Sequence, residues 1–522
     1  MTDPGRTGIL SADRHLPLET LAISSRRCAA GFASLGVRQG GRVALLLRND
    51  FAFFEATQGA SLLGASTVPL NWHLTAEEVA YILADCSARV LVVHSDLFTR
   101  SMQAVIRQAG VMAILVPTPE EVLQAYPAVA GVVQSDPDLE WDSWLQRFEP
   151  WQAGPVPIVG PMFYTSGTTG RPKGVQRAGN VPAEVAMAAQ RRTVAAFGLA
   201  PIEGGDPPRA VMTGPLYHSA PNAYGMNVVR NGGLLVLQSR FDAAELLWLI
   251  EAHRITHLHM VPTMFVRLLA LPAEVRARHD LSSLRCVVHG AAPCPPEVKR
   301  QMIDWWGAVI GEYYAMTETG IITVSDSLQW LTHPGTVGCP ALGVQIRIDD
   351  DHGLPLPAGQ PGEICIRSEI TDYVSYHRSE AKTATLRRGG FLCTGDVGTL
   401  TEDGFLFISD RKSDMVISGG VNIYPAEIEA VLLNLPRVKD AAVFGLPDDV
   451  MGERVVAVVE RSDAALTQAD VVAGLRDKLA SYKMPREIRF DIPLPREDSG
   501  KVKKRLLRDQ WLSQIAGLAG KT

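Results

Sequence analysis

A short segment, residues 164–175, concentrates the residue types that bind anions. It reads YTSGTTGRPKGV and contains three glycines, one serine, three threonines and one lysine, directly after an apolar run at residues 158–163 that predicts a buried strand. Glycine lets backbone N–H groups approach an anion closely, hydroxyl groups add hydrogen-bond donors, and lysine adds a positive charge. The combination predicts a phosphate cradle, although the same composition is also typical of a surface turn.

The spacing of this segment differs from that of the P-loop in nucleotide-binding kinases. A P-loop has four residues between its two glycines and a serine or threonine after its lysine. Here Gly167 and Gly170 are closer together, and Gly174 follows Lys173. The difference disfavours a P-loop kinase and removes the hydroxyl that would bind magnesium, so a cation would need a carboxylate from elsewhere in the chain.

The composition is that of a soluble globular protein with two or more domains. Hydrophobic residues make up 46% of the 522 residues and charged residues 20%, and the net charge is −6. A mildly acidic chain gives no reason to expect nucleic acid or an anionic membrane as a partner. The first residues lead into no apolar leader, and no apolar run would span a bilayer, so we expect a cytoplasmic protein without a transmembrane segment.

Seven cysteines are spread along the chain without a CxxC pair. This spacing is typical of reduced thiols in the core of a protein from a reducing compartment. We therefore expect reduced core thiols and assign chemistry to none of these residues: Cys28, Cys86, Cys286, Cys294, Cys339, Cys365 and Cys393.

The elements that must position the glycine-rich segment alternate between strand and helix. Apolar runs of strand length occur at residues 42–47, 89–93, 210–212, 233–237, 258–261 and 284–289, and helical spacing occurs at 18–35, 51–63, 71–85, 243–252 and 264–271. Such alternation predicts an α/β fold in which helices cover mostly parallel sheets. From Gly335 onward, short strands at 344–348, 362–367 and 405–408 predict a small antiparallel, barrel-like part.

A polar run at residues 410–414, DRKSD, marks the best candidate domain boundary. The chain beyond it has helical patterns from Pro425 and at 468–480, and strand patterns at 441–444, 455–459 and 488–492. A length of about a hundred residues is typical of a small domain. We therefore predict a large N-terminal domain at residues 1–410 and a small α+β domain at residues 411–522.

Four further motifs follow the glycine-rich segment: YYAMTETG at residues 313–320, TGDVG at 394–398, DRKSDMVISGGVNIYPAEIE at 410–429 and SGKVKKR at 499–505. With YTSGTTGRPKGV, they closely resemble the acyl-CoA synthetases of the adenylate-forming enzyme superfamily, over essentially the whole chain. The resemblance implies a mobile C-terminal domain and a reaction in two steps. A carboxylate and ATP form acyl-AMP and pyrophosphate, and the thiolate of coenzyme A then displaces AMP.

The resemblance also assigns residues to an ATP site. It implies that Glu318 binds the Mg²⁺ ion used with ATP, that Thr317 contacts the α-phosphate, and that Asp396 accepts hydrogen bonds from the ribose hydroxyls. Tyr314 should lie along the adenine, and Arg411 should add a ribose or phosphate contact. The remaining implied residues belong to the glycine-rich segment and to a second loop of small residues: Thr165, Ser166, Gly167, Thr168, Thr169, Gly170, Lys173, Gly290, Ala291 and Ala292.

In the same family pattern, Lys501 neutralises charge between the carboxylate and the α-phosphate during adenylation. Because Lys501 lies far along the chain from the glycine-rich segment, the C-terminal domain must close over the N-terminal domain to deliver it. The thioester step would use a rotated orientation of the same domain. In that orientation, Ser418, Gly419 and Gly420 should line the channel for the pantetheine arm of coenzyme A, because small residues leave room for it.

The hinge between the two orientations is expected at Ser413, two positions after Arg411. Relatives often carry an aspartate or a lysine there. Whether Ser413 alters the rotation stays open, and Lys412 or Asp414 is an alternative hinge residue.

The acid is expected to bind beside residues that the family pattern places around an acyl pocket: Tyr217, His218, Met226, Ala315 and Met316. His218 would lie near the reacting carboxylate, although a histidine flanked by an aromatic residue also often serves only in packing. The small residues leave space, and these segments contain no lysine or arginine for a second carboxylate. We therefore expect a hydrophobic monocarboxylic acid, with a fatty, alicyclic or aryl-alkyl chain.

Two other functions remain compatible with the motifs. An adenylating enzyme could pass the acyl group to a carrier protein instead of coenzyme A, or oxidise it as luciferases do. A non-catalytic nucleotide-binding protein is disfavoured, because a degenerate copy should have lost one of Glu318, Asp396, Arg411 and Lys501. The expected partners are thus a small carboxylic acid, ATP and coenzyme A, and formation of a homodimer is left open.

Overall fold

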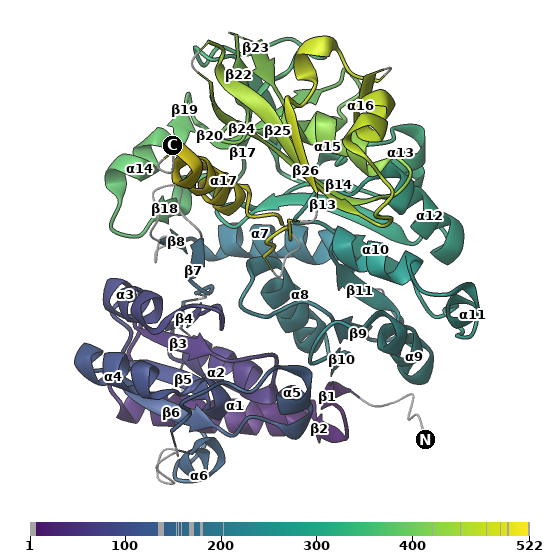
Figure 1. The fold of residues 1–522 in the computed structure, drawn as a ribbon. Coiled ribbons are helices and arrows are strands. Elements are labelled where there is room, and N and C mark those ends of the chain that lie inside the picture. The colour runs from purple at the N-terminus through teal and green to yellow at the C-terminus, as the bar shows by residue number, and fades with distance from the viewer. Residues whose placement is uncertain are drawn as a thin grey trace.

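The structure is a computed structural model that describes the chain except residues 1–6, 134–139, 153, 155, 158, 166–171, 178–180, 202, 420, 449, 477, 491, 498–500 and 520–522, and the side chains of 380–382 and 515–519. Figure 1 shows the first helices and strands at one end of the molecule and the last strands at the other. Between them lies a large sheet built from the middle of the chain.

The first sheet is parallel, and helices cover both of its faces. Its strand order is β4-β3-β5-β6. Alternate residues of the central strands enter two different cores, since Val43 and Leu45 pack with helices α1 and α2 while Ala44 and Leu46 pack with α3 and α4. The bounds are β3 (Arg42–Leu46), β4 (Ser66–Pro69), β5 (Val90–His94), β6 (Met112–Val116), α1 (Leu18–Ser34), α2 (Phe51–Leu62), α3 (Ala76–Cys86) and α4 (Arg100–Ala109), followed by α5 (Glu120–Ala125) and α6 (Trp141–Leu145).

The central sheet runs in the order β15-β14-β13-β12-β11-β9-β10-β1-β2, with a parallel middle and antiparallel edges. Its strands are β1 (Gly8–Ser11), β2 (Arg14–Leu16), β9 (Arg209–Met212), β10 (Leu234–Leu237), β11 (His257–Met260), β12 (Cys286–His289), β13 (Ile310–Met316), β14 (Gly320–Ser325) and β15 (Cys339–Pro340). The helices around it are α7 (Ala183–Ala196), α8 (Ser219–Arg230), α9 (Ala243–His253), α10 (Pro262–Leu269), α11 (Ala273–Arg276), α12 (Pro296–Trp306) and α13 (Ser327–Thr332).

Two antiparallel sheets sit beside this α/β part. One has the order β16-β17-β20-β19 with β21 on β20, and the other has the order β18-β8-β7. The bounds are β7 (Phe163–Thr165), β8 (Lys173–Arg177), β16 (Gln345–Asp349), β17 (Gly362–Arg367), β18 (Val374–Tyr376), β19 (Arg387–Arg388), β20 (Phe391–Leu400), β21 (Leu406–Arg411) and helix α14 (Glu380–Thr385). The second sheet joins the strands that flank the glycine-rich segment to a strand from far along the chain.

The C-terminal part has a sheet in the order β23-β22-β25-β24, with β26 on β25, and its own apolar cores. On one face α15 and α16 pack, and on the other Leu507 and Trp511 of α17 pack against Phe444. The bounds are β22 (Val416–Ser418), β23 (Val421–Ile423), β24 (Val438–Asp448), β25 (Gly452–Arg461), β26 (Glu487–Phe490), α15 (Pro425–Leu433), α16 (Gln468–Arg476) and α17 (Lys504–Ala519). Each core residue named here follows Asp410 in sequence, and the predicted boundary at 410/411 itself stays a prediction.

The predicted α/β fold with an antiparallel part and a small C-terminal α+β part is confirmed, and two element predictions are wrong. The strand expected at residues 158–163 begins only at Phe163, and Pro161 in that run lacks the N–H group that a ladder needs. Residue 158 itself lies outside the described residues. Helix α3 begins at Ala76 and not at residue 71, because Thr75 forms a capping box with Glu78.

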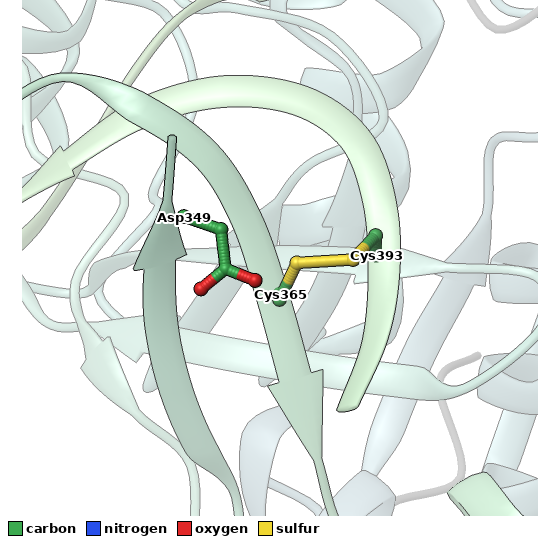
Figure 2. Close-up of side chains that lie close together, drawn as sticks. All are labelled: Asp349, Cys365 and Cys393. Atoms are coloured by element: carbon green, nitrogen blue, oxygen red, sulfur yellow. A yellow bond between two sulfur atoms is a disulfide. The ribbon is translucent and has the colours of Figure 1, made fainter. Parts of the chain in front are cut away.

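The expectation of reduced thiols is wrong for two of the cysteines. Cys365 of β17 and Cys393 of β20 lie opposite each other on neighbouring strands, with Cα atoms 4.1 Å apart, and form a disulfide (Figure 2). Their separation along the chain hides this pairing from sequence spacing. Figure 2 also shows the Asp349 carboxylate near the sulfur atoms, but disulfide sulfurs are not thiolate ligands, and Asp349 is paired with Arg347 at 2.6 Å. This group is therefore not a metal site while the disulfide is intact.

Among the described helices, none combines the length and the apolar character needed to cross a membrane.

Candidate active site

A large cleft follows the carboxyl ends of the central strands and extends to the junction with the C-terminal part. Ligands of open α/β sheets bind at this edge, because the loops after parallel strands gather there. Residues from most of the predicted groups line the cleft: Thr165, Lys173, Tyr217, His218, Met226, Ala291, Ala292, Tyr314, Ala315, Met316, Thr317, Glu318, Asp396, Arg411, Ser413 and Lys501. The fold thus brings together motifs that are separated by up to several hundred residues.

The strands on either side of the glycine-rich segment form a hairpin, in which Thr165 of β7 lies opposite Lys173 of β8. Both residues line the cleft. The predicted phosphate-binding residues Ser166, Gly167, Thr168, Thr169 and Gly170 lie outside the described residues.

Tyr376 is a site residue that the sequence did not reveal. It lies on β18, which pairs with β8, and its ring is 5.4 Å from the Nζ atom of Lys173. Its hydroxyl donates a 2.9 Å hydrogen bond to the Oε1 atom of Glu318. No sequence signal could have found this contact, because it depends on the pairing of two strands that lie far apart in the chain.

Glu318 and Thr317 occupy the turn between β13 and β14. The Glu318 residue is only 7% exposed, and it still borders the cleft. The Oγ1 atom of Thr317 lies 3.5 Å from the Oγ atom of Ser219, the first residue of α8. The turn therefore holds a carboxylate and a hydroxyl side by side at the start of a helix.

Asp396 is held between two of the other predicted residues. The Tyr314 hydroxyl donates a 2.5 Å hydrogen bond to its Oδ2 atom, and Arg411 on the facing strand places Nε 3.3 Å from its Oδ1 atom. Burial, followed by the Asp396 charge, raises the pKa of Tyr314 well above its usual value. The three residues form one polar group at the edge of the cleft, where β20 and β21 pair.

The predicted small-residue loop directly follows β12. A Cβ atom on Gly290 would lie 2.8 Å from the Tyr313 carbonyl oxygen and 2.7 Å from its ring, so this close approach requires glycine. Ala291 has a φ of +69°, a conformation that residues other than glycine rarely adopt. Ala291 and Ala292 line the cleft, while Gly290 lies behind them.

Lys501 reaches the cleft from the segment that precedes α17. Its carbonyl oxygen accepts a 2.8 Å hydrogen bond from the Glu497 N–H group. Burial and then the charge of Arg411 lower the pKa of Lys501, while Asp414, Glu497 and Asp396 act in the opposite direction. The Lys501 ammonium group therefore interacts with Arg411 and Asp396, which lie about a hundred residues earlier in the chain.

The expected hinge residue lines the cleft, whereas the described residues of the expected coenzyme A channel do not. Ser413 lines the cleft and donates a 3.2 Å hydrogen bond to Asp414, while Lys412 pairs with Glu363 of β17 at 3.3 Å. Ser418 and Gly419 belong to the β22–β23 hairpin, do not line the cleft, and are joined to the next turn by the Gly419 N–H bond to the Met451 carbonyl oxygen. Gly420 lies outside the described residues.

The predicted acyl residues surround the part of the cleft beside α8. His218 immediately precedes this helix, and its ring centroid is 4.4 Å from that of Tyr217, which contacts Trp72 edge to face at 4.6 Å. Met226, Ala315 and Met316 are partly buried and pack against the main apolar core. The wall of this region is therefore aromatic at Tyr217 and His218 and aliphatic at Met226, Ala315 and Met316.

The chain matches two protein-family models. Residues 2–371 match the AMP-binding enzyme model, and residues 427–501 match the model of the AMP-binding enzyme C-terminal domain. The chain therefore belongs to the AMP-binding enzymes and, as its motifs predicted, to the acyl-CoA synthetases of the adenylate-forming superfamily. ATP and coenzyme A are the cosubstrates of such acid–CoA ligases.

Curated relatives cover nearly the whole chain. A feruloyl-CoA synthase from Amycolatopsis sp is 33% identical over 97% of this chain and 96% of that protein. A CoA ligase for a methyl-dioxo-octahydroindenyl propanoyl acid from Rhodococcus jostii is 33% identical over 97% of this chain and 95% of that protein. A long-chain-fatty-acid–CoA ligase, FadD13, from Mycobacterium tuberculosis is 30% identical over 97% of this chain and 95% of that protein.

Solved structures share the fold over a similar length. The ATP-bound structure of MatB from Rhodopseudomonas palustris has a TM-score of 0.82 and 27% identity, and covers 98% of this chain and 97% of that chain. The amide bond synthetase McbA from Marinactinospora thermotolerans has a TM-score of 0.80 and 27% identity, and covers 97% of this chain and 96% of that chain.

Proposed function

We propose that this protein is an ATP- and Mg²⁺-dependent acid–CoA ligase that activates a hydrophobic monocarboxylic acid and transfers the acyl group to coenzyme A. The observation that carries the proposal is that Lys501 of the C-terminal part borders the same cleft as Thr317, Glu318 and Asp396. These side chains supply an ammonium group, a hydroxyl and two carboxylates, which are the kinds of groups that support attack on a nucleotide phosphate.

In the first step, a carboxylate oxygen of the acid attacks the α-phosphorus of ATP. The bond from that phosphorus to the oxygen of the pyrophosphate leaving group breaks, so acyl-AMP and pyrophosphate form. Negative charge rises on the oxygens around the α-phosphorus, and Lys501 and the Thr317 hydroxyl would stabilise it. Lys173 and Thr165 would hold the departing phosphates, and Asp396 would fix the ribose.

Glu318 fits the role of the magnesium ligand. Mg²⁺ is usually bound through one or two carboxylates together with phosphate oxygens and water. Glu318 is a cleft-lining carboxylate that Tyr376 orients, and among the described residues no lysine or arginine forms an ion pair with it. When bound, Mg²⁺ would neutralise charge on the phosphate oxygens.

In the second step, the thiolate of coenzyme A attacks the acyl carbon, and the bond from that carbon to the phosphate oxygen of AMP breaks. Ser418 and Gly419 lie away from the cleft while Lys501 borders it. We therefore place this step in a second orientation of the C-terminal domain, which turns the β22–β23 hairpin toward the acyl-AMP, with Ser413 at the hinge.

The proposed acid is hydrophobic because the region beside α8 is built from small and apolar residues. Ala223, Met226 and Ala315 line it, and they pack against the apolar core. Three relatives are named for a phenolic, an alicyclic and a long-chain fatty acid, which supports a fatty, alicyclic or aryl-alkyl acid here.

The direct test is pyrophosphate release across acids graded by chain length and ring content, with ATP, Mg²⁺ and coenzyme A present. We expect AMP release that requires coenzyme A, and the best acids should be extended and apolar. If no acid supports pyrophosphate exchange or AMP release that depends on coenzyme A, the protein is not the proposed ligase.

The acyl acceptor is tested separately. One relative of similar fold is an amide bond synthetase, so the acceptor can differ among proteins that share this architecture. Replacing coenzyme A with a holo-carrier protein, or with an amine, should give slower acyl transfer than coenzyme A. Faster transfer to a carrier protein would favour the alternative that the enzyme is an acyl–carrier-protein ligase.

A further inference from the structure

Residues of α7 and α8 also line the cleft, beyond the predicted acyl residues. Its lining residues recur at helical spacing. On α8 they include Ala223, Met226 and Arg230, and on α7 they include Ala186 and Gln190. Residues three and four apart lie on one face of a helix. One face of each helix therefore lines the cleft. The lining residues of α8 extend to its C-terminal end.

The polarity of the cleft-lining residues changes along α8. Near His218 the cleft is lined by Ala220, Ala223 and Met226, whereas further along it is lined by Asn227 and Arg230, with Gln190 on the facing helix. Phe197 packs on Tyr224 at a centroid distance of 5.5 Å, which confirms that the two helices lie side by side here. The part of the cleft beside the C-terminal end of α8 is thus polar, whereas the part beside the first turns of α8 is apolar.

The three polar residues share one acceptor. Gln190 Nε2 and Arg230 Nη1 both donate hydrogen bonds to Asn227 Oδ1, and the second of these bonds is 3.2 Å long. Asn227 is 2% exposed, and its own amide nitrogen donates to the Ala223 carbonyl oxygen at 2.8 Å. Among the described residues, Arg230 forms no ion pair with an aspartate or glutamate. Arg230 is exposed and has five N–H donors, so the donors beyond its bond to Asn227 are accessible to a ligand in the cleft.

We propose that the far end of the acid carries an acceptor oxygen, either a carbonyl or a carboxylate oxygen, that binds to Gln190, Asn227 and Arg230. This inference rests on the proposed ligase function and adds a polar end to an otherwise apolar acid. A carbonyl oxygen keeps the acid monocarboxylic, whereas a carboxylate oxygen makes it dicarboxylic and replaces that part of the proposal. An acceptor oxygen of the acid would accept from the remaining guanidinium N–H groups of Arg230, and a hydrogen bond from a charged donor is stronger than one from a neutral donor. Arg230 lies one helical turn beyond the segment in which the sequence predicted no arginine for the acid.

Helix geometry sets the length of this acid. The family pattern places the reacting carboxylate beside His218, at the start of α8. The helix advances about 1.5 Å per residue, so Asn227 lies roughly 13 Å further along. An extended chain advances about 1.2 Å per bond, as a polypeptide does, so it needs about eleven bonds to reach this distance. A medium-length chain or a set of fused rings would therefore place its terminal oxygen at the polar residues.

The test compares three acids of equal chain length: dodecanoic acid, its analogue with a keto group next to the terminal methyl, and dodecanedioic acid. We expect at least one oxygenated acid to have a KM about tenfold below that of dodecanoic acid, with kcat little changed, because the contact is remote from the reacting carboxyl group. A preference for the keto acid assigns a neutral carbonyl. A preference for the diacid that weakens with salt assigns a carboxylate bound by Arg230.

Variants connect this preference to the named residues. Gln190→Leu and Arg230→Met should each reduce the difference in KM between oxygenated and plain acids. Arg191→Met is the matched control, because Arg191 is exposed on α7 and does not line the cleft, so the difference should persist. The inference is overturned if the wild-type enzyme is active and uses dodecanoic acid as well as both oxygenated acids. Absence of pyrophosphate release with every acid would instead refute the proposed ligase function.

Discussion

Tyr376 joins two charged groups of the site. Its hydroxyl donates to the Glu318 carboxylate at 2.9 Å, and its ring centroid lies 5.4 Å from the Lys173 ammonium group. A cation near the face of an aromatic ring is attracted to it, and a carboxylate that accepts a hydrogen bond is fixed in orientation. One side chain can therefore position both the predicted metal ligand and the lysine of the phosphate-binding hairpin.

We predict that Tyr376→Phe weakens the use of Mg²⁺ without removing it. The variant keeps the ring but loses the donor that orients Glu318, and loss of such an outer partner typically costs about tenfold or more in metal affinity. The measurements are the Mg²⁺ concentration for half-maximal pyrophosphate exchange and the Mg²⁺ dependence of ATP binding by calorimetry. Glu318→Gln should have a larger effect. Tyr373→Phe is the control, because Tyr373 lies three residues before Tyr376 and does not line the cleft, and it should have no effect. An unchanged Mg²⁺ dependence in Tyr376→Phe would show that the Tyr376 hydroxyl does not position Glu318.

Lys501 should set the alkaline limit of adenylation. Burial and Arg411 lower its pKa, and the carboxylates of Asp414, Glu497 and Asp396 only partly oppose this effect. A lysine with a lowered pKa loses its proton at a lower pH, so the charge that stabilises the α-phosphate is present below that pKa and is lost above it. We therefore expect kcat/KM for pyrophosphate exchange to fall at a pH below the ordinary lysine pKa of about 10.4.

The control for this pH profile is Lys501→Arg. Arginine stays protonated across the whole range, so the remaining activity should lose the alkaline fall even if its magnitude is reduced. If the fall stays at the same pH in this variant, another group is responsible for it.

At the scale of elements, β20 and β21 show what the sequence could predict and what it could not. The TGD motif marked Asp396, which lines the cleft, and the apolar run at 405–408 marked a strand, since both signals are local. The register that sets Asp396 opposite Arg411 depends on the pairing of whole strands. The same limit explains the missed Cys365–Cys393 bond and the missed role of Tyr376, because each depends on strands brought together by the fold.

Buried strands of the parallel sheets were the easiest elements to predict. Residues 42–46 and 90–94 are apolar on both faces because helices cover both faces, so a continuous apolar run marks them. The run at residues 158–163 has a similar apolar content, but it contains Pro161. Proline has no N–H group, so it cannot donate a hydrogen bond to a neighbouring strand. Apolar runs therefore predicted the core strands correctly but misplaced the start of β7, the first strand of the β7–β8 hairpin.

A buried ion pair holds the segment that carries Lys501. Lys504 at the start of α17 pairs with Glu429 of α15 at 2.9 Å, and each side chain is 17% exposed. Glu429 also accepts a hydrogen bond from the Val443 N–H group. The pair joins two helices across the C-terminal sheet, three residues from the lysine that must reach the cleft.

We predict that Lys504→Met destabilises the C-terminal part, because it leaves the Glu429 carboxylate buried without its partner. The expected loss is roughly 2 kcal/mol, below the 3–5 kcal/mol of a fully buried pair because both side chains retain some exposure. Denaturant unfolding combined with hydrogen exchange in α15 measures this effect. Lys503→Met is the matched control, since Lys503 is exposed and should change stability little. Equal stability of both variants would show that the pair is not a structural support.

At the scale of the whole molecule, the structure corresponds to one of the two proposed orientations. Lys501 borders the cleft, and Lys412 is paired with Glu363 and Asp351 of the N-terminal part, while the β22–β23 hairpin does not line the cleft. Rotation about Ser413 would withdraw Lys501, which follows the hinge. Lys412 precedes the hinge, so its pairs with Asp351 and Glu363 can persist in both orientations.

The two orientations make the half-reactions separable, which Lys501→Ala tests. Lys501 would act on the α-phosphate during adenylation and would be withdrawn during thioester formation. The variant should therefore lose pyrophosphate exchange by about a hundredfold or more, the effect of removing a transition-state donor. With chemically supplied acyl-AMP and coenzyme A, it should form the thioester at close to the wild-type rate. Lys478→Ala, in the same C-terminal part but exposed and not lining the cleft, should retain both half-reactions. Equal loss of both in Lys501→Ala would mean that a single orientation of the domain performs both steps.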